Sequence, residues 1–539
     1  MTNRLTNFLA ALVLAILLAV SISTAARDSL TFDEKAHIVA GYSYLTQKDH
    51  RLNTEHPPLL KDLAAIPLLF IKPNFPSQSL NWTQNDSAPA WWVQFDLGNE
   101  FLYESGNDPS QIIFWSRAPM ILLLVVLAAF VFWWAKRLGG PWTGLGALLL
   151  TAFSPTLIAH GRLVTTDVGA ALGVLMATAA WLWFLKNPSI KRSVGAGAVL
   201  GLALLTKFSV LLLIPSFALI TIVYVLIHRQ SAGRYIGLSI LAGVVAALTI
   251  WPVYAFHISS YPAERQLRDT AADLAPYPNP TIRNLELQLT REPLLRPWAQ
   301  YARGVLMANQ RASFGNTTYF LGEVSASGRA DYFPIIYFFK EPLALHLLTL
   351  IALVGLWRIR KNFVVLSFII FVIIYWAFAI KSNLNIGVRH LLPTYPFIFI
   401  LLMLGVKRFN RIAVAGVLIW YIGSSAAAFP YYLSYYNELA GGINNGYKIA
   451  VDSNYDWGQD FYRLLAFVQD NNISQLNLDY FGGEDPQYWL GDVYIPLDPK
   501  ETPTGWLAIS ANHLNQYGRF ANQEPLARAG KSIFIYKID

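Results

Sequence analysis

Two short charged motifs follow the first apolar run of the chain. The first is Thr31-Phe32-Asp33-Glu34, and the second is Glu55-His56-Pro57-Pro58-Leu59-Leu60-Lys61. Ionisable residues this close to long apolar segments are costly, so they mark a functional site by default. The two motifs therefore form a candidate functional site beside the membrane.

The local sequence also predicts how these residues are positioned. Thr31 and Glu34 form a capping box that opens a helix toward Tyr44, with Asp33 in its favourable first turn. Pro57 and Pro58 suit the start of a second short helix that carries Lys61 about one turn inward. An ordinary pair of capped interfacial helices gives the same pattern, so the motifs alone leave both interpretations open.

Composition predicts the fold class. Hydrophobic residues make up 54% and charged residues 14% of the 539 residues, and the mean hydropathy is +0.38. This is too apolar for a soluble domain. We predict a polytopic α-helical membrane protein with about eleven transmembrane helices, near 8–26, 113–134, 141–159, 167–185, 193–206, 209–228, 236–256, 334–357, 362–380, 390–406 and 411–429.

The basic residues predict the orientation. Under this map they cluster at one side of the membrane, which the positive-inside rule assigns to the cytoplasm together with the N-terminus. The net charge of +8 therefore reflects topology, and no nucleic-acid partner is predicted. The segments 27–112, 257–333 and 430–539 then face outward. We also expect a tight hairpin near Thr206-Lys207, with Lys207 in a structural role.

The chain divides by composition. Residues 1–429 form the predicted membrane domain, with outward loops 27–112 and 257–333. Residues 430–539 are polar and predict a small extracytoplasmic α/β domain, with a helix over 459–470 and strands near 476–480, 506–510 and 533–536. The chain has no cysteine, which excludes disulfides and thiolate chemistry.

Further motifs follow these in order along the chain. They are Arg162-Leu163-Val164-Thr165-Thr166-Asp167, Tyr319-Phe320-Leu321-Gly322-Glu323, Leu384-Asn385-Ile386-Gly387-Val388-Arg389-His390-Leu391-Leu392-Pro393 and Asp452-Ser453-Asn454-Tyr455-Asp456-Trp457-Gly458-Gln459-Asp460.

Together with 32–34 and 56–61, these motifs resemble the lipid-carrier-dependent glycosyltransferases of the GT-C membrane fold. That group holds the protein O-mannosyltransferases and the bacterial aminoarabinose transferase. The resemblance implies a polyprenyl-phosphate-linked sugar as donor, a lipid, glycan or protein acceptor, and transfer at the outer face of the bacterial inner membrane.

The resemblance also implies roles for individual residues. Asp33 is the expected general base, and Glu34 is expected to orient the acceptor or the loop. Substrate or carrier phosphate binding is expected of His56, Lys61, Arg162, Asp167, Glu323, Arg389 and His390.

Simpler interpretations exist for several of these residues. Arg389 and His390 suit headgroup anchoring, but two adjacent cations after a glycine exceed that need, so phosphate binding is favoured. Lys61 could instead extend its ammonium to the headgroup level, and Asp167 could cap a helix.

No cofactor is predicted. Glu34 and His37 share one helix face, but two ligands rarely hold a metal without a third and fourth. A divalent metal near this loop therefore stays an alternative outside the prediction.

Two other function classes fit many spans with embedded charges. One is a transporter or channel for a polar or lipid-linked solute, and the other is a non-catalytic lipid- or glycan-binding scaffold. Large outward loops, and charges at one face rather than the midplane, argue against the transporter. Ion-coupled substrate uptake would support the transporter, whereas loss of transfer activity on changing Asp33 alone would exclude the scaffold.

The topology gives a first test. Reporter fusions at Gln300 and Gln459 should report an extracytoplasmic position, and a fusion at Lys361 should report the cytoplasm. The opposite result at either outward site would contradict the map.

Overall fold

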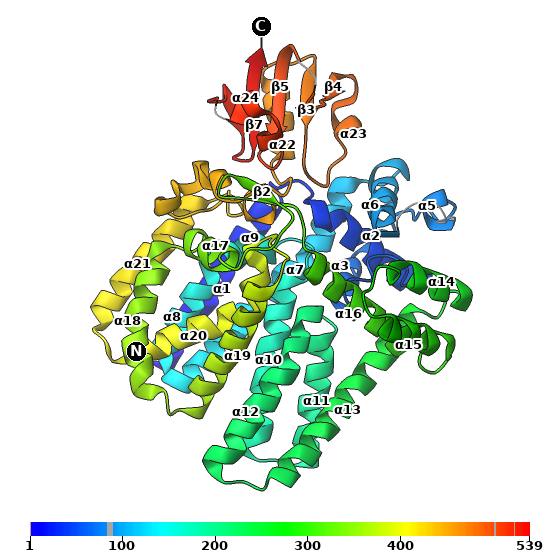
Figure 1. Ribbon diagram of the computed structural model, residues 1–539. Coiled ribbons are helices and arrows are strands. Elements are labelled where there is room, and N and C mark those ends of the chain that lie inside the picture. Colours follow the sequence, from blue (N-terminus) through cyan, green and yellow to red (C-terminus); the bar gives the residue numbers. More distant parts are fainter. Residues whose placement is uncertain (1, 84–89, 501–502, 522, 539) are drawn as a thin grey trace.

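The computed structural model describes residues 2–83, 90–500, 503–521 and 523–538. Residues 84–89 of the loop 27–112, and 501–502, 522 and 539 of the segment 430–539, lie outside the described residues. Figure 1 shows a helical bundle with a small sheet at one end, which holds the C-terminus. The turn between α12 and α13 lies at the other end.

Most of the predicted apolar runs form helices long enough to cross a membrane. Within the described ranges, eight spans are long enough and apolar enough to cross a membrane. They are α1 (Asn3–Ala25), α7 (Pro109–Gly139), α10 (Asp167–Lys186), η2 (Phe208–Leu212) with α12 (Leu213–His228), α13 (Ala232–His257), α19 (Phe363–Lys381), η3 (Val388–Thr394) with α20 (Tyr395–Gly405) and η4 (Val406–Arg408), and α21 (Arg411–Ala428).

The remaining apolar runs also form helices, in less regular ways. Two runs are bent pairs: α8 (Pro141–Ala152) meets α9 (Pro155–Gly161) at 60°, and α17 (Tyr332–Lys340) meets α18 (Leu343–Ile359) at 110°. The eleventh is α11 (Ile190–Leu204), whose 15 residues span only about 22 Å. It packs against α10 and α13. The fold class of a multi-pass helical membrane protein is confirmed, with eight to ten spans by length and α11 as the short one.

The two long loops, 27–112 and 257–333, fold into short helices and a hairpin. The first loop holds α2 (Phe32–Gln47), α3 (Leu59–Ala65), α4 (Leu68–Ile71), α5 (Leu80–Thr83), α6 (Ala90–Asn99) and the π-helix η1 (Glu100–Glu104). The second holds α14 (Ala263–Asp273), α15 (Pro280–Arg291), α16 (Arg296–Phe314), β1 (Thr318–Phe320) and β2 (Glu323–Ser325). The helix predicted after Pro57 begins later, at Leu59, with Pro58 as its N-cap.

The C-terminal region contains the predicted helix and strands. Its sheet has the order β4-β3-β5-β7-β6. β3 pairs in parallel with β4 and β5, and β7 pairs antiparallel with both β5 and β6. Buried Phe461, Leu464 and Val468 form one face of α22, as a helical period requires. The elements are α22 (Phe461–Asp470), β3 (Leu476–Asp479), α23 (Pro486–Leu490), β4 (Tyr494–Pro496), β5 (Gly505–Ser510), α24 (Gly518–Ala521), β6 (Ala527–Ala529) and β7 (Ile533–Ile538).

The sheet rests on the loop that leads into α2. The ring of Phe481, just after β3, stacks on the ring of Phe32 with centroids 5.2 Å apart. The N–H of Gly483 donates to the carbonyl of Leu30 at 3.1 Å. The C-terminal region therefore helps to fix the start of α2, while its boundary at residue 430 stays a prediction.

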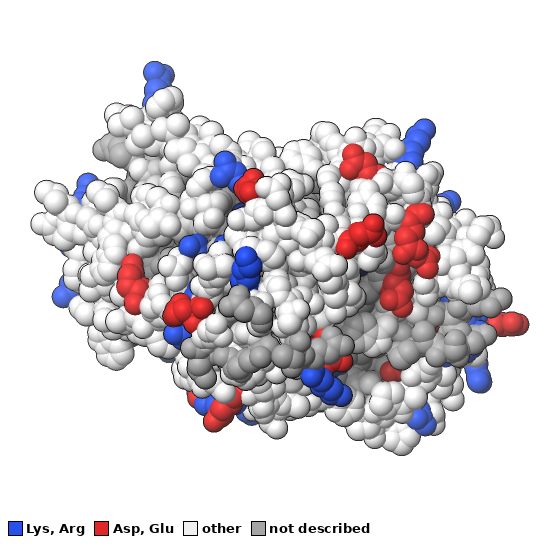
Figure 2. Space-filling view, turned by 90° about the horizontal axis from the view of Figure 1, so that it is seen from above, with Lys and Arg blue, Asp and Glu red and all other residues white. Residues whose placement is uncertain are grey.

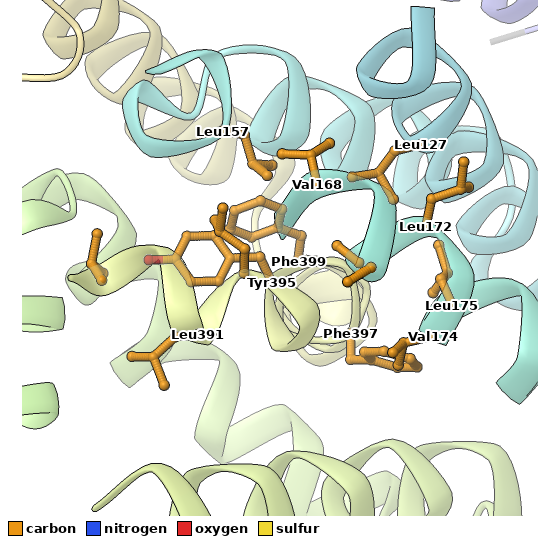
Figure 3. Packing of buried hydrophobic residues seen from close by; sticks show 14 of the residues in the cluster. Leu127, Leu157, Val168, Leu172, Val174, Leu175, Leu391, Tyr395, Phe397 and Phe399 are labelled. Carbon is orange, nitrogen blue, oxygen red and sulfur yellow. The ribbon is translucent and has the colours of Figure 1, made fainter. Parts of the chain in front are cut away.

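Two spans form the centre of the bundle. In the most apolar stretch of each span, 72% of the residues are buried for α10 and 78% for the η3–α20 span. The same share is 17–44% for the other six spans. Figure 3 shows Leu172 and Leu175 of α10 among the side chains of α20 and α7. Residues at the starts of these two spans therefore meet in the interior.

A buried ion pair anchors the start of α2. Arg117 of α7 donates from Nε and Nη2 to the two oxygens of Glu34, at 2.9 and 2.6 Å. The same carboxylate accepts from the backbone N–H of Thr31 at 3.0 Å, which completes the predicted capping box. Burial raises the pKa of Glu34, but Arg117 and these hydrogen bonds outweigh burial and hold that pKa below its ordinary value.

Loss of this pair should destabilise the protein. Glu34→Gln leaves the Arg117 charge buried without a counter-ion, which costs about 3 kcal/mol. We expect a clear fall in the midpoint of thermal unfolding in detergent. A lowered folded-state pKa stabilises fully above the ordinary value of 4.5. The difference from wild type should therefore begin to shrink as the pH falls below 4.5, and it should be lost as the pH falls through the lowered pKa of Glu34.

The matched control is Glu323→Gln, which breaks an exposed pair with Arg329. This control should leave the unfolding midpoint unchanged. Equal midpoints for wild type and Glu34→Gln would contradict the anchoring role.

Candidate functional site

A cavity of about 310 Å³ lies where α2, α16, η2, α19 and η3 meet. Part of its lining is apolar and includes Phe208, Leu212, Val305 and Phe378. The charged residues and histidines of the lining are Asp33, Glu55, His56, Lys207, Arg311, Arg389 and His390. A cavity that combines apolar and cationic lining suits an amphipathic anion.

Asp33 faces this cavity from the first turn of α2. Its Oδ2 lies 3.1 Å from Nη1 of Arg389, and its side chain is 23% exposed. Asp33 is therefore the carboxylate of the first motif that a bound molecule can reach.

Arg389 lies between two carboxylates. Its Nη1 is 3.7 Å from Oδ2 of Asp167 as well as close to Asp33. The other oxygen of Asp167 accepts from the ammonium of Lys207. The four charges come from α2, α10, the residue before η2, and η3, so the site forms only when these elements meet.

The C-terminal region holds Arg389 from the other side. Ser453 Oγ accepts from Nε of Arg389 at 3.2 Å, and the guanidinium lies over the Trp457 ring at 4.3 Å. Oδ1 of Asn454 accepts from the N–H of Val388 at 2.9 Å. The 452–460 motif thus positions the guanidinium, which explains why the two motifs occur together.

Five predicted site residues lie outside the cavity lining. One of them, Asp167, contacts the lining residues Lys207 and Arg389 from behind, as described above. Glu34 is engaged by Arg117, as described above. The ammonium of Lys61 donates to Tyr44 Oη, to both oxygens of Asn53 and to the carbonyl of His56, at 2.8–2.9 Å. Lys61 therefore shapes the loop that carries His56.

The other two residues outside the lining are Arg162 and Glu323. Arg162 is buried and paired with Asp28. Glu323 stands on β2 with a 74% exposed side chain, 3.0 Å from Arg329. Their expected roles in substrate binding stay predictions, and the contacts seen for Arg162 are those of a residue that joins elements together.

Two cationic residues of the cavity lining, Lys207 and Arg311, were not among the predicted site residues. Lys207 was expected to be structural, but its ammonium binds Asp167 at the cavity. A lone cation between two apolar runs was a signal for such a role. Arg311 of α16 pairs with Glu55 at 2.8 Å, and the sequence around Arg311 gave no comparable signal.

Burial sets the protonation of His56. Desolvation, with the neighbouring His37 and Lys61, lowers the pKa of His56 well below its ordinary value. His56 is thus neutral near pH 7 and offers a hydrogen bond rather than a charge. Burial also raises the pKa of Asp452, near Arg389, to about 6.

No cluster of three or more metal-ligating side chains occurs among the described residues. The expectation of a reaction without a metal cofactor stays a prediction.

A family model matches part of the chain, and solved structures match nearly all of it. Residues 111–256, from α7 to α13, match the family model of dolichyl-phosphate-mannose-protein mannosyltransferases. No curated protein matches the sequence.

Two solved structures are similar to this chain at low sequence identity. The crystal structure of ArnT from Cupriavidus metallidurans bound to undecaprenyl phosphate has 12% identity and a TM-score of 0.51, over 97% of both chains. The oligosaccharyltransferase AglB from Archaeoglobus fulgidus, in complex with an inhibitory peptide and a dolichol-phosphate, has 14% identity and a TM-score of 0.48. That match covers 98% of this chain and 65% of the other.

The family match over residues 111–256 and the fold shared with ArnT agree with the resemblance that the motifs predicted. Over residues 111–256 the chain matches the dolichyl-phosphate-mannose-protein mannosyltransferases, and over nearly its whole length it has the GT-C fold of ArnT.

Proposed function

We propose that this protein is a glycosyltransferase that moves a sugar from a polyprenyl-phosphate-linked donor to an acceptor at the extracytoplasmic face of the membrane. The observation that carries the proposal is the placement of Asp33 beside Arg389 and Lys207 in one cavity with a partly apolar lining. The shared fold with ArnT, which was solved bound to undecaprenyl phosphate, supports the class of carrier.

The apolar and cationic parts of the lining match the two parts of such a donor. The apolar part, with Phe208, Leu212 and Phe378, suits the first isoprene units, because burying them there removes apolar surface from water. Arg389 and Lys207 suit the phosphate, because charge-assisted hydrogen bonds to phosphate oxygens are strong in a desolvated site. The neutral imidazole of His56 adds a hydrogen-bond partner for the phosphate or the sugar.

The proposed reaction is a direct displacement. Asp33 takes the proton of the acceptor hydroxyl while the hydroxyl oxygen forms a bond to the anomeric carbon. The bond from that carbon to the phosphate oxygen breaks, and its electron pair leaves with the phosphate. Arg389 and Lys207 stabilise the added negative charge, and the proton on Asp33 passes to solvent.

The ion pairs of Arg389 could change when the donor phosphate binds. Arg389 contacts both Asp33 and Asp167, so a phosphate bound at its guanidinium competes with Asp33 for the same donors. Donor binding would thereby release the Asp33 carboxylate toward the acceptor. Asp167 keeps Lys207 and Arg389 in place throughout, because it is fully buried against them.

The distribution of basic residues supports an extracytoplasmic location for the Asp33 cavity. The Asp33 cavity lies at the end of the bundle opposite the basic helix connections, and positive connections face the cytoplasm. The catalytic loop and the C-terminal sheet would then face away from the cytoplasm, in the bacterial inner membrane.

The test is the rate of sugar transfer by Asp33→Asn. Asparagine keeps the size of the side chain but cannot take a proton, and a general base contributes about two to four orders of magnitude in rate. Single-turnover transfer should fall by that amount while insertion and donor binding persist. The polyprenyl-phosphate sugar that accumulates in cells lacking the protein, identified by mass spectrometry, supplies the donor.

Asp331→Asn is the matched control, because Asp331 pairs with Arg329 away from the cavity lining. It should transfer sugar at the wild-type rate. A near-normal rate for Asp33→Asn, with an inactive Asp167→Asn, would show that the base is misassigned.

A further inference from the structure

A second cavity, of about 330 Å³, lies between the end of α18, the start of α19 and the turn after α20. Its polar lining residues are Arg358, Asn362, Lys407 and Arg408, and Leu138 at the end of α7 closes one side. Figure 1 shows α18, α19 and α20 next to one another in this part of the bundle.

This cavity is a full membrane span away from the Asp33 cavity. Arg389 stands at the start, and Arg408 at the end, of one span of 21 residues. At the rise of an α-helix these residues are about 30 Å apart. The two cavities therefore open at opposite ends of the bundle and are independent sites.

The charges of the second cavity are uncompensated. Within the described residues, the side chains of Arg358, Lys407 and Arg408 take part in no hydrogen bond or ion pair. No Asp or Glu occurs between Glu341 and Glu438, the stretch that supplies all three cations.

The Asp33 cavity differs in this respect. There, Arg389 faces Asp33 and Arg311 faces Glu55. Figure 2 shows acidic as well as basic side chains on the end of the molecule that carries the sheet. The second cavity thus lacks the internal counter-ions that the first one has.

The backbone around the second cavity is preformed. A Cβ added to Gly355 would lie 1.8 Å from the carbonyl oxygen of Gly405, so α18 and α20 touch backbone to backbone beside it. This contact fixes the helix ends that carry Arg358 and Lys407. The N-terminus of α19, capped by Asn362, adds partial positive charge.

Helix dipoles and the positive-inside rule each explain single cations at such helix ends. They do not explain three unpaired cations around one cavity, because like charges brought together repel unless an anion binds. Exposed apolar side chains lie close in sequence to the lining residues: Trp357, beside Arg358, is 68% exposed, and Ile412, four residues after Arg408, is 84% exposed. These side chains suit acyl chains.

We propose that this cavity binds the phosphate headgroup of an anionic membrane lipid, held by Arg358, Lys407 and Arg408. Basic pockets between transmembrane helices bind such headgroups by adding charge attraction to a fitted cavity. The proposal does not depend on the glycosyltransferase function, because no residue is shared with the Asp33 cavity.

The experiment compares lipid retention by the full-length protein. The protein is placed in phosphatidylcholine nanodiscs with increasing phosphatidylglycerol, and bound lipid is counted by native mass spectrometry. Each near-surface cation contributes about 1 kcal/mol, or about fivefold in affinity. The triple variant R358Q/K407Q/R408Q should therefore bind phosphatidylglycerol on the order of a hundredfold more weakly than wild type.

The matched control is K186Q/K191Q/R229Q, which removes the same charge outside the cavity lining. Lys186 and Arg229 follow spans that start at the Asp33 end, so this variant acts at the same membrane face. It should keep near-wild-type retention. Equal loss in both triple variants would overturn the proposal, because a general surface field would then explain the binding.

Two further measurements keep the result interpretable. If the triple variant does not insert, the single variants R358Q, K407Q and R408Q carry the test, each with an expected loss of about fivefold against K191Q. Inorganic phosphate at millimolar concentration should not displace the lipid. Displacement by inorganic phosphate would overturn the lipid assignment in favour of a free-anion site.

Discussion

The candidate site depends on one arrangement of charges, in which Arg389 lies between Asp33 and Asp167 and Lys207 completes the set. Charges taken out of water are costly, and only close partners repay that cost. Each of these residues comes from a different part of the chain. The electrostatic requirement therefore aligns α2, α10, η2 and η3, and the cavity is the space that remains where their ends meet.

A second set of buried pairs supports this arrangement without lining the cavity. Arg117 holds Glu34, and Asp28 joins Arg162 to Arg463 of α22. The pairs tie the loop before α2 to α7, α9 and the C-terminal region. The long segments thus form a frame around Asp33, and the 452–460 motif belongs to that frame because it positions Arg389.

Features set by local sequence could be predicted. The apolar runs coincide with helices because span length and hydropathy are local properties. The capping box of Thr31 and Glu34 and the alternating strands of the C-terminal sheet formed for the same reason.

Long-range pairings could not be predicted from the sequence. Lys207 meets Asp167 across 40 residues, and Arg311 meets Glu55 across 256. Glu34 shows the same limit at short range. Neighbours on a helix point about 100° apart, so Asp33 reaches the cavity while Glu34 faces Arg117. The type and spacing of residues in the sequence identified the region of the site. The directions of the side chains in the structure then separated Asp33, which faces the cavity, from Glu34, which faces Arg117.

The central claim is that the cations of the Asp33 cavity bind the carrier phosphate. The most direct measurement is the affinity of the full-length protein for polyprenyl phosphate, compared between wild type and Arg389→Lys. Lysine keeps the charge but lacks the planar fork that binds two phosphate oxygens and stacks on Trp457. The account predicts binding weaker by about tenfold or more, with Arg329→Lys, outside the cavity lining, unchanged. Wild-type affinity in Arg389→Lys would contradict it.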